Sequence, residues 1–207
     1  MLEAGTTGKG EHLYAVVLAA GASTRFGSPK QLVRIGGRPL LHTIVARAAE
    51  VTGNALIVVL GSGAGQLAPL LKHTAGSVVV NRQWREGLAS SIRTGIAHLP
   101  STCAGALLVL ADQPAVTSED LRRLVGSWRR RPQCIAAALY AGTTGAPAIF
   151  PRSAFAELAR LRGDAGARLV LRRNADRVLR VPMPSAELDL DTPEDLLALE
   201  PASSGAP

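Results

Sequence analysis

The sequence predicts an α/β fold, a three-layer α/β/α arrangement around a mostly parallel central sheet. Apolar segments of strand length alternate with helical patterns along nearly the whole chain. Several of these segments are continuously apolar, as expected of strands that are covered on both faces. Because such alternation produces strands joined by crossover helices, we expect helices on both faces of the sheet.

The expected elements follow one another in order along the chain. The expected strands are 14–19, 55–60, 77–80, 106–111, 135–139, 146–150 and 178–181. The expected helices are 39–50, 64–72, 88–98, 118–130, 153–161, 165–173 and 193–199. Pro39 and Pro193 suit the first position of a helix, and the segments 117–120 and 192–195 resemble capping boxes that carry a short acid.

The length and composition favour one folded unit. The chain has 207 residues, of which 47% are hydrophobic and 19% charged, so it is long enough to bury a full core. We expect a single domain over residues 12–200. The segments 1–11 and 201–207 are rich in Gly, Ser, Thr and Pro, and we expect them to be flexible.

The positive charge of the chain raises the question of a nucleic-acid partner. The formal net charge is +7, and three consecutive arginines, Arg129, Arg130 and Arg131, form one short cluster. No aromatic residues interleave this cluster, so stacked recognition of a single strand is poorly supported and an exposed helix end is expected. Positive charge fits small phosphorylated ligands equally well, and no nucleic-acid partner is expected.

Targeting signals and cysteine chemistry are both inconspicuous. The first twelve residues lack the apolar segment of a signal peptide, and no apolar run reaches the length of a membrane helix. Cys103 and Cys134 have no metal-ligand spacing. We therefore expect a cytoplasmic protein with reduced thiols and no membrane partner.

The loop after the first expected strand has the composition of a phosphate-binding loop. The strand ends near Ala20, and the loop contains Gly21, Ser23, Arg25 and Lys30. Small residues let backbone N–H groups approach an oxyanion, and the two cations supply countercharge for a triphosphate. Glycine-rich turns also occur without a ligand, and the register is not that of a Walker A loop. The two cations and the serine within ten residues nevertheless favour phosphate binding.

Two aspartates stand where ligands bind in α/β sheets. Asp112 directly follows a buried strand, and Asp191 stands just before an expected helix near the C-terminus. Two carboxylates suit Mg²⁺, which completes its coordination with water and phosphates. Asp191 alone has the alternative explanation of local turn chemistry. The pair, together with the cationic loop, predicts Mg²⁺ as the cofactor.

These motifs resemble those of the molybdopterin-type nucleotidyltransferases, and within that family those of the molybdenum cofactor cytidylyltransferases. The first loop has the pattern LAAG-x-S-x-R-x-G-x-x-K, and the resemblance extends from about Tyr14 to Leu199. The further matches are Asn81-x-x-Trp84-x-x-Gly87-x-x-Ser90-Ser91-x-x-x-Gly95, Asp112-Gln-Pro114, Gly145-x-Pro147, Gly163-Asp-x-Gly-Ala-Arg168 and Asp189-x-Asp191-Thr-Pro-Glu-Asp. The resemblance implies a Rossmann-like nucleotidyltransferase fold. It also implies Mg²⁺-dependent transfer of CMP from CTP to the terminal phosphate of molybdenum-molybdopterin, with release of pyrophosphate, and a molybdoenzyme as a possible recipient of the product.

The resemblance also implies roles for individual residues. The implied catalytic residues are Lys30, Arg25 and Asp112, and the implied Mg²⁺ ligands are Asp112 and Asp191. The implied nucleotide-binding residues are Leu18, Ala19, Ala20, Gly21, Ser23, Arg25, Lys30, Asn81, Ser90, Ser91 and Asp112. The implied acceptor-binding residues are Gln113, Pro114, Gly145, Pro147, Asp164 and Arg168. Guanylyl-transferring relatives usually have Gly at the position of Ala20, so the resemblance implies CTP rather than GTP.

Some of these residues can also be explained without the resemblance, by packing or local structure alone. Gly87, Ser91 and Gly95 share one helix face, and Gly95 suits tight packing as well as ligand contact. Asp164 would serve equally well as a helix cap, and Arg168 as an ordinary exposed cation. Two alternative functions also stay open: transfer to another phosphorylated acceptor, and a non-catalytic carrier that hands the cofactor to an apo-enzyme.

Overall fold

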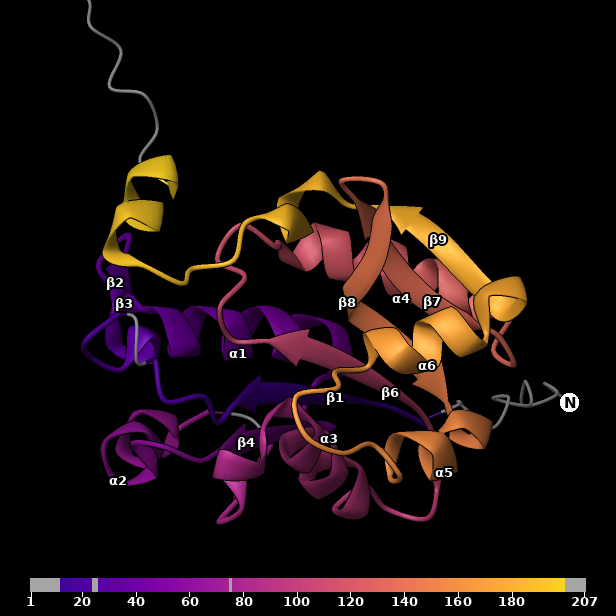
Figure 1. Cartoon of the computed structure of the whole chain (residues 1–207), viewed down its shortest axis with the longest axis horizontal. Coiled ribbons are helices and arrows are strands. Elements are labelled where there is room, and N and C mark those ends of the chain that lie inside the picture. The colour runs from indigo at the N-terminus through magenta and orange to yellow at the C-terminus, as the bar shows by residue number, and fades with distance from the viewer. Residues whose placement is uncertain (1–11, 24–25, 75, 200–207) are drawn as a thin grey trace, which may run out of the picture.

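A seven-stranded sheet forms the centre of the computed structural model, which describes residues 12–23, 26–74 and 76–199 (Figure 1). The strands of this sheet are β1 (His12–Ala19), β4 (Leu56–Leu60), β5 (Ser77–Val80), β6 (Cys103–Leu110), β7 (Ile135–Tyr140), β8 (Thr143–Pro151) and β9 (Val178–Pro182). All seven were predicted. A separate antiparallel hairpin of β2 (Arg34–Ile35) and β3 (Arg38–Pro39) was not, because strands of two residues show no periodicity in a sequence. The termini expected to be flexible lie outside the described residues.

Helices fill the connections, as predicted, but several are shorter than expected. The α-helices are α1 (Leu40–Thr52), α2 (Ala64–Leu67), α3 (Leu88–Ala97), α4 (Ser118–Arg130), α5 (Phe155–Leu158) and α6 (Arg168–Arg173). Short 3₁₀ helices cover Lys30–Leu32, Ala68–Leu71, Trp84–Glu86, Arg152–Ala154, Ala175–Arg177, Pro184–Glu187 and Pro193–Leu199. No helix of the described residues is long and apolar enough to cross a membrane.

The sheet is mostly parallel, with strand order β5-β4-β1-β6-β8-β7-β9. The pairs β1–β4, β1–β6, β4–β5 and β7–β9 are parallel, whereas β8 is antiparallel to both β6 and β7. The carboxyl ends of β5, β4, β1, β6, β7 and β9 therefore lie at one edge of the sheet. Since β8 runs the other way, its first residues reach the same edge.

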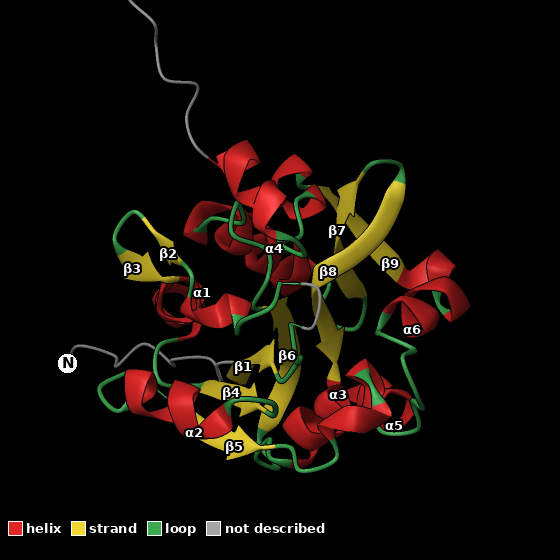
Figure 2. Cartoon of the chain, turned by 60° about the vertical axis from the view of Figure 1, so that its left-hand side comes forward, coloured by secondary structure: helices red, strands yellow, loops and turns green. Residues whose placement is uncertain are grey.

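The alternation of side chains along the strands builds two cores, one on each face of the sheet. Ala15 and Val17 of β1 pack in a cluster with α1 and α4, whereas Val16 and Leu18 pack in a second cluster with α3, α5 and α6. Figure 2 shows α1 and α4 on one side of the strands and α3 and α5 on the other. The predicted α/β/α layering is confirmed.

The sequence left open the roles of Gly95 and Asp164, and the structure explains both. A Cβ on Gly95 would overlap Cγ1 of Val16, so this glycine lets α3 approach the sheet closely. Helix α6 begins at Arg168 without a side-chain cap, so Asp164, four residues earlier, is not its cap. The arginine cluster that begins at Arg129 is exposed at the end of α4, as expected.

Helix α4 begins with the complete capping box that the sequence predicts. Thr117 Oγ1 accepts a hydrogen bond from the Asp120 N–H at 3.1 Å, and Asp120 Oδ2 accepts one from the Thr117 N–H at 2.9 Å. Ser185 Oγ also donates to Asp120 Oδ2, at 2.8 Å. Burial by itself raises the pKa of Asp120, but hydrogen bonds from Thr117, Ser185 and Arg123 outweigh it and hold the pKa below its ordinary value.

We expect Asp120→Asn to lower the free energy of unfolding at pH 7 by about 1–2 kcal/mol, since it weakens a helix cap and a buried hydrogen-bond acceptor. A lowered folded-state pKa stabilises the fold above the ordinary carboxyl pKa, and this contribution is lost as the pH falls through the folded-state value. In urea unfolding, the difference from the wild type should therefore shrink between pH 7 and pH 3. Glu119→Gln, an exposed neighbour in the same turn, is the control. A loss that stays the same at every pH would contradict the role of the charge.

Candidate active site

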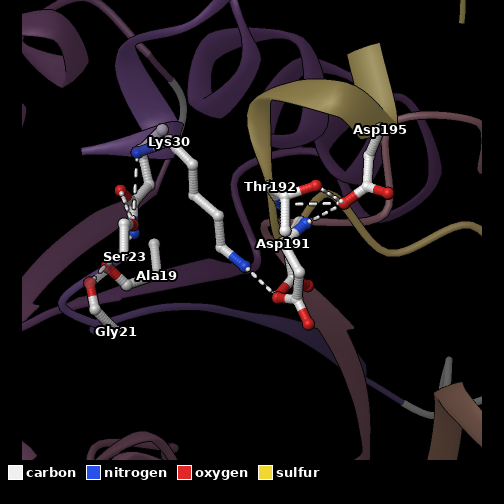
Figure 3. Close-up of polar contacts among 9 residues, drawn as sticks. Ala19, Gly21, Ser23, Lys30, Asp191, Thr192 and Asp195 are labelled. Atoms are coloured by element: carbon white, nitrogen blue, oxygen red, sulfur yellow. Dashed lines mark hydrogen bonds and ion pairs between the residues drawn. The ribbon is translucent and has the colours of Figure 1, made fainter. Parts of the chain in front are cut away.

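Lys30 lies between two carboxylates at the edge of the sheet where β1 and β6 end. Its Nζ is 2.8 Å from Oδ2 of Asp112 and 3.1 Å from Oδ1 of Asp191, and its side chain is only 12% exposed. Figure 3 shows the Lys30 side chain extending across to the segment that carries Asp191. Asp112 comes from the loop after β6, and Asp191 comes from a position 79 residues later, just before the last 3₁₀ helix. Three distant segments thus form one cluster.

The ammonium group of Lys30 is stabilised in its charged form. Burial lowers the pKa of Lys30, but the charge and hydrogen bond of Asp112, with those of Asp191, outweigh it and raise the pKa above its ordinary value. Lys30 is therefore a fixed positive charge at neutral pH, and it is not suited to serve as a base.

A buried glutamine holds the loop that precedes Lys30. Gln31, 2% exposed, donates through Nε2 to the carbonyl oxygens of Ala19 and Gly21 at 3.4 and 3.3 Å. Ser23 Oγ donates to Gln31 Oε1 at 3.3 Å and accepts from the Lys30 N–H at 3.2 Å. The loop is thus fixed from inside. Sequence reasoning missed Gln31, because nothing distinguishes it there from an ordinary surface glutamine.

A second buried glutamine holds the two aspartates in relation to each other. Gln113, 1% exposed, donates through Nε2 to the carbonyl oxygens of Ala186 at 2.9 Å and Ala146 at 3.2 Å. The Leu190 N–H donates to the carbonyl oxygen of Asp112 at 2.8 Å. These bonds tie the segment that ends in Asp191 to the loop that begins with Asp112. Gln113 was expected to bind the acceptor; its Nε2 donates to backbone, and its Oε1 is buried without a hydrogen-bond partner among the described residues.

The turn after Asp191 orders the backbone of the C-terminal segment. Asp195 Oδ2 accepts hydrogen bonds from the N–H groups of Asp191 at 2.8 Å and Thr192 at 2.7 Å (Figure 3). The Asp195 N–H donates to the carbonyl of Thr192 rather than to its hydroxyl, so the predicted capping box is only half formed. The helix that follows is a 3₁₀ helix, with Pro193 at its first position as predicted.

Asp189 adds a third carboxylate to this region. Its pKa is raised to about 6, first by burial and then by the negative charges of Asp112 and Asp191. Asp112 and Asp191 thus lie near enough to Asp189 to disfavour its ionised form, which places three carboxylates in this region.

Two adjoining cavities open at this edge of the sheet. The first, of about 410 Å³, is lined by the loop after β1, Lys30, Asp112, Asp191 and the segment after β5. The second, of about 430 Å³, is lined by apolar side chains of the sheet and α3 together with Tyr140, Arg168, Arg172 and Asp189. Four residues line both cavities: Leu18, Leu88, Leu110 and Asp164. Ligands in the two cavities would therefore meet along this shared wall.

Most residues predicted to bind the nucleotide line the first cavity. They are Leu18, Ala19, Ala20, Gly21, Ser23, Lys30, Ser91 and Asp112, together with the expected metal ligand Asp191. Asn81 and Ser90 instead lie beneath its wall, where Asn81 Nδ2 donates to Ser90 Oγ at 2.8 Å and to Ser91 Oγ at 3.1 Å. Arg25 lies outside the described residues.

The residues predicted to bind the acceptor are divided among different places. Asp164 and Arg168 line the second cavity. Gly145 and Pro147 are buried on β8, and a Cβ on Gly145 would overlap the hydroxyl of Tyr140. Pro114 is buried, and its carbonyl accepts a hydrogen bond from Arg47 at 2.7 Å. Tyr140 and Arg172, which sequence reasoning missed, line the second cavity. Trp84 and Arg85, which belong to the matched segment 81–95, line the first.

The donor set at the first cavity fits a divalent cation whose coordination is shared with a ligand. Asp112 Oδ1 is buried and has no hydrogen-bond partner among the described residues, and an unpaired carboxylate oxygen is costly to bury. No group of three or more His, Cys, Asp or Glu side chains suited to a metal was found among those residues. A cation held by one or two carboxylates and completed by phosphates and water is the arrangement that Mg²⁺ favours.

The fold and site define a nucleotidyltransferase. The family model described as "MobA-like NTP transferase domain" matches residues 15–178, and the chain belongs to this family. Membership implies a nucleoside triphosphate as one substrate.

Similar proteins include a mycobacterial protein of nearly the same length. Rv0371c from Mycobacterium tuberculosis H37Rv is 33% identical, with a TM-score of 0.78 over 91% of this chain and 97% of that chain. One structure of Rv0371c, 31% identical over 91% and 97% of the two chains with a TM-score of 0.71, is a complex with manganese. The bifunctional protein GlmU of Sorangium cellulosum is 32% identical over 57% of this chain, and the chain spans about a quarter (26%) of that relative. The molybdopterin-guanine dinucleotide biosynthesis protein A of Archaeoglobus fulgidus, 18% identical with a TM-score of 0.65 over 90% of this chain and 96% of that chain, shares the fold.

Proposed function

We propose that this nucleotidyltransferase transfers CMP from CTP to the terminal phosphate of molybdenum-molybdopterin, with release of pyrophosphate. The observation that carries the proposal is the pair of adjoining cavities. One contains the loop after β1, Lys30 and the two aspartates, and the other contains two arginines. A transferase needs two such sites side by side. The choice of CTP and of the pterin acceptor is supported by the motifs, above all by Ala20 and the segment 163–168.

Residues of the chain have distinct roles in this proposal. The backbone N–H groups of the loop that begins at Gly21 bind the triphosphate, and Lys30 neutralises charge on the α-phosphate and on the leaving group. Asp112 and Asp191 hold Mg²⁺, which supplies further neutralisation of phosphate charge when bound. Arg168, whose Nη2 donates to the Tyr140 hydroxyl at 2.9 Å, holds the acceptor phosphate in the second cavity.

The proposed reaction is an in-line displacement at phosphorus. An oxygen of the acceptor phosphate forms a bond to the α-phosphorus of CTP, the bond from that phosphorus to the β-bridging oxygen breaks, and pyrophosphate leaves. The acceptor phosphate is already anionic at neutral pH, so no side chain has to remove a proton from it. A site whose partly buried amine, that of Lys30, is held in its protonated form suits this chemistry.

The proposal is tested by measuring pyrophosphate release with each of the four nucleoside triphosphates. Each is assayed with Mg²⁺, with and without molybdenum-loaded molybdopterin, and with a sugar 1-phosphate as a competing acceptor. Release only with CTP and the pterin is the expected result. Release with the sugar phosphate alone would instead assign another phosphorylated acceptor. No release, despite measured binding of the pterin, would indicate a carrier.

A further inference from the structure

Arg85 is a cation of the first cavity to which no role has been assigned above. It belongs to the 3₁₀ helix Trp84–Glu86, which connects β5 to α3, and both Trp84 and Arg85 line the cavity. The guanidinium carbon of Arg85 lies 4.4 Å from the centroid of the Trp84 ring, a cation–π contact. The turn closes with the Gly87 N–H donating to the carbonyl of Trp84 at 3.1 Å, and Gly87 has φ 95°, which favours glycine.

The tryptophan under Arg85 is fixed beside the phosphate-binding loop. A Cβ on Gly61, directly after β4, would lie 2.7 Å from Cβ of Trp84 and 2.7 Å from the carbonyl oxygen of Ala20. Trp84 and the start of the loop therefore pack against the same glycine. Arg85 is itself exposed, but the tryptophan on which it stacks packs next to the loop.

The charges around the cavity leave Arg85 available to an anion. The charged side chains of the described lining are Lys30, Arg85, Asp112, Asp164 and Asp191. Lys30 is paired with Asp112 and Asp191. No carboxylate of the described residues lies within ion-pair distance of Arg85, and its neighbour Glu86 pairs with Arg93 at 2.6 Å.

We propose that Arg85 binds the polyphosphate of the bound nucleoside triphosphate. This inference rests on the proposed function only in that a triphosphate occupies the first cavity. With three carboxylates against two cations in the described lining, a triphosphate requires positive charge beyond that of Lys30. A guanidinium stacked on an indole keeps its edge N–H groups for phosphate oxygens, and the stacking limits the side-chain entropy that is lost on binding.

The test compares Arg85→Gln with Arg82→Gln by calorimetric titration with CTP, CDP and CMP in the presence of Mg²⁺. Arg82 is exposed just before the same turn and lines neither cavity, so it is the matched control. We expect Arg85→Gln to weaken CTP binding by roughly tenfold or more, as for loss of a charge-assisted hydrogen bond. The loss should become smaller for CDP and smallest for CMP, while Arg82→Gln binds all three as the wild type does.

Two outcomes of these titrations would overturn the proposed role of Arg85. An equal loss for all three nucleotides would overturn the phosphate role and indicate a contact with the nucleoside. Unchanged CTP binding would also overturn it. Repeating the titrations with GTP separates the two proposals: equal binding of GTP by the wild type would reject the preference for CTP, whereas Arg85 would still be judged by the dependence on phosphate number.

Discussion

Asp112→Asn is expected to lower the rate of nucleotidyl transfer by roughly 10³, the upper end of the effect of losing one preorganised electrostatic group. The substitution removes the charge that pairs with Lys30 at 2.8 Å and also leaves the proposed metal site with an amide in place of a carboxylate. Steady-state pyrophosphate release over a range of Mg²⁺ concentrations measures the effect. If Asp112 holds the metal, higher Mg²⁺ should recover part of the activity, since weaker coordination is offset by mass action.

The control for this variant is Asp176→Asn, an exposed aspartate of the 3₁₀ helix Ala175–Arg177. It should turn over as the wild type does. Thermal unfolding of both variants shows whether the fold is retained. Wild-type turnover by a folded Asp112→Asn protein would reject both the metal role and the proposed mechanism.

Lys30→Ala is expected to lower kcat by roughly 10² to 10³, as for the loss of one preorganised electrostatic group. The ammonium of Lys30 is partly buried, paired with two carboxylates and held in its charged form. Its loss removes the charge that is proposed to act on the α-phosphate, and it leaves Asp112 and Asp191 without the cation that pairs with both. Lys72→Ala, at an exposed lysine after the 3₁₀ helix Ala68–Leu71, is the matched control. Single-turnover measurements at saturating nucleotide separate the chemical step from binding.

The prediction is specific because it distinguishes a fall in kcat from a rise in KM. If Lys30 acts on the charge that develops during transfer, kcat should fall much more than KM rises. A variant that raises KM alone would show that Lys30 only helps to bind CTP. A variant with unchanged kcat and unchanged KM would show that the lysine has no role in binding or in turnover.

The elements that the sequence predicted best are those whose pattern is repeated and local. The seven strands of the central sheet were found because each is a short apolar run, most of them next to a helical pattern, and Thr117 was recognised as a cap from the acid three residues later. Helix ends were less accurate. Helix α6 begins at Arg168, three residues later than expected, because loop residues can continue an apolar period without forming a helix.

Local sequence patterns did not predict how exposed each strand is. Strand β5 is as apolar as its neighbours, yet Val78 and Val80 are 39% and 52% exposed. The reason is that β5 is the edge strand, next to β4 alone, and strand order depends on contacts that are remote in sequence. The antiparallel direction of β8 likewise depends on contacts that are remote in sequence.

Local patterns in the sequence were sufficient to predict the fold class and the chemical types present at the site: a small-residue loop after β1, a lysine, an aspartate directly after β6 and another before the last helix. Local patterns carry this information, since an apolar run followed by Gly, Ser or Asp is sufficient to place a residue at the edge of a sheet. Which of these residues meet depends on the packing of distant segments. Lys30, Asp112 and Asp191 converge across 161 residues of sequence, and Gln31 and Gln113 fix them through bonds to backbone carbonyls. Such bonds leave no trace in a sequence, because any segment has carbonyl groups and only the packing determines which of them a buried amide reaches.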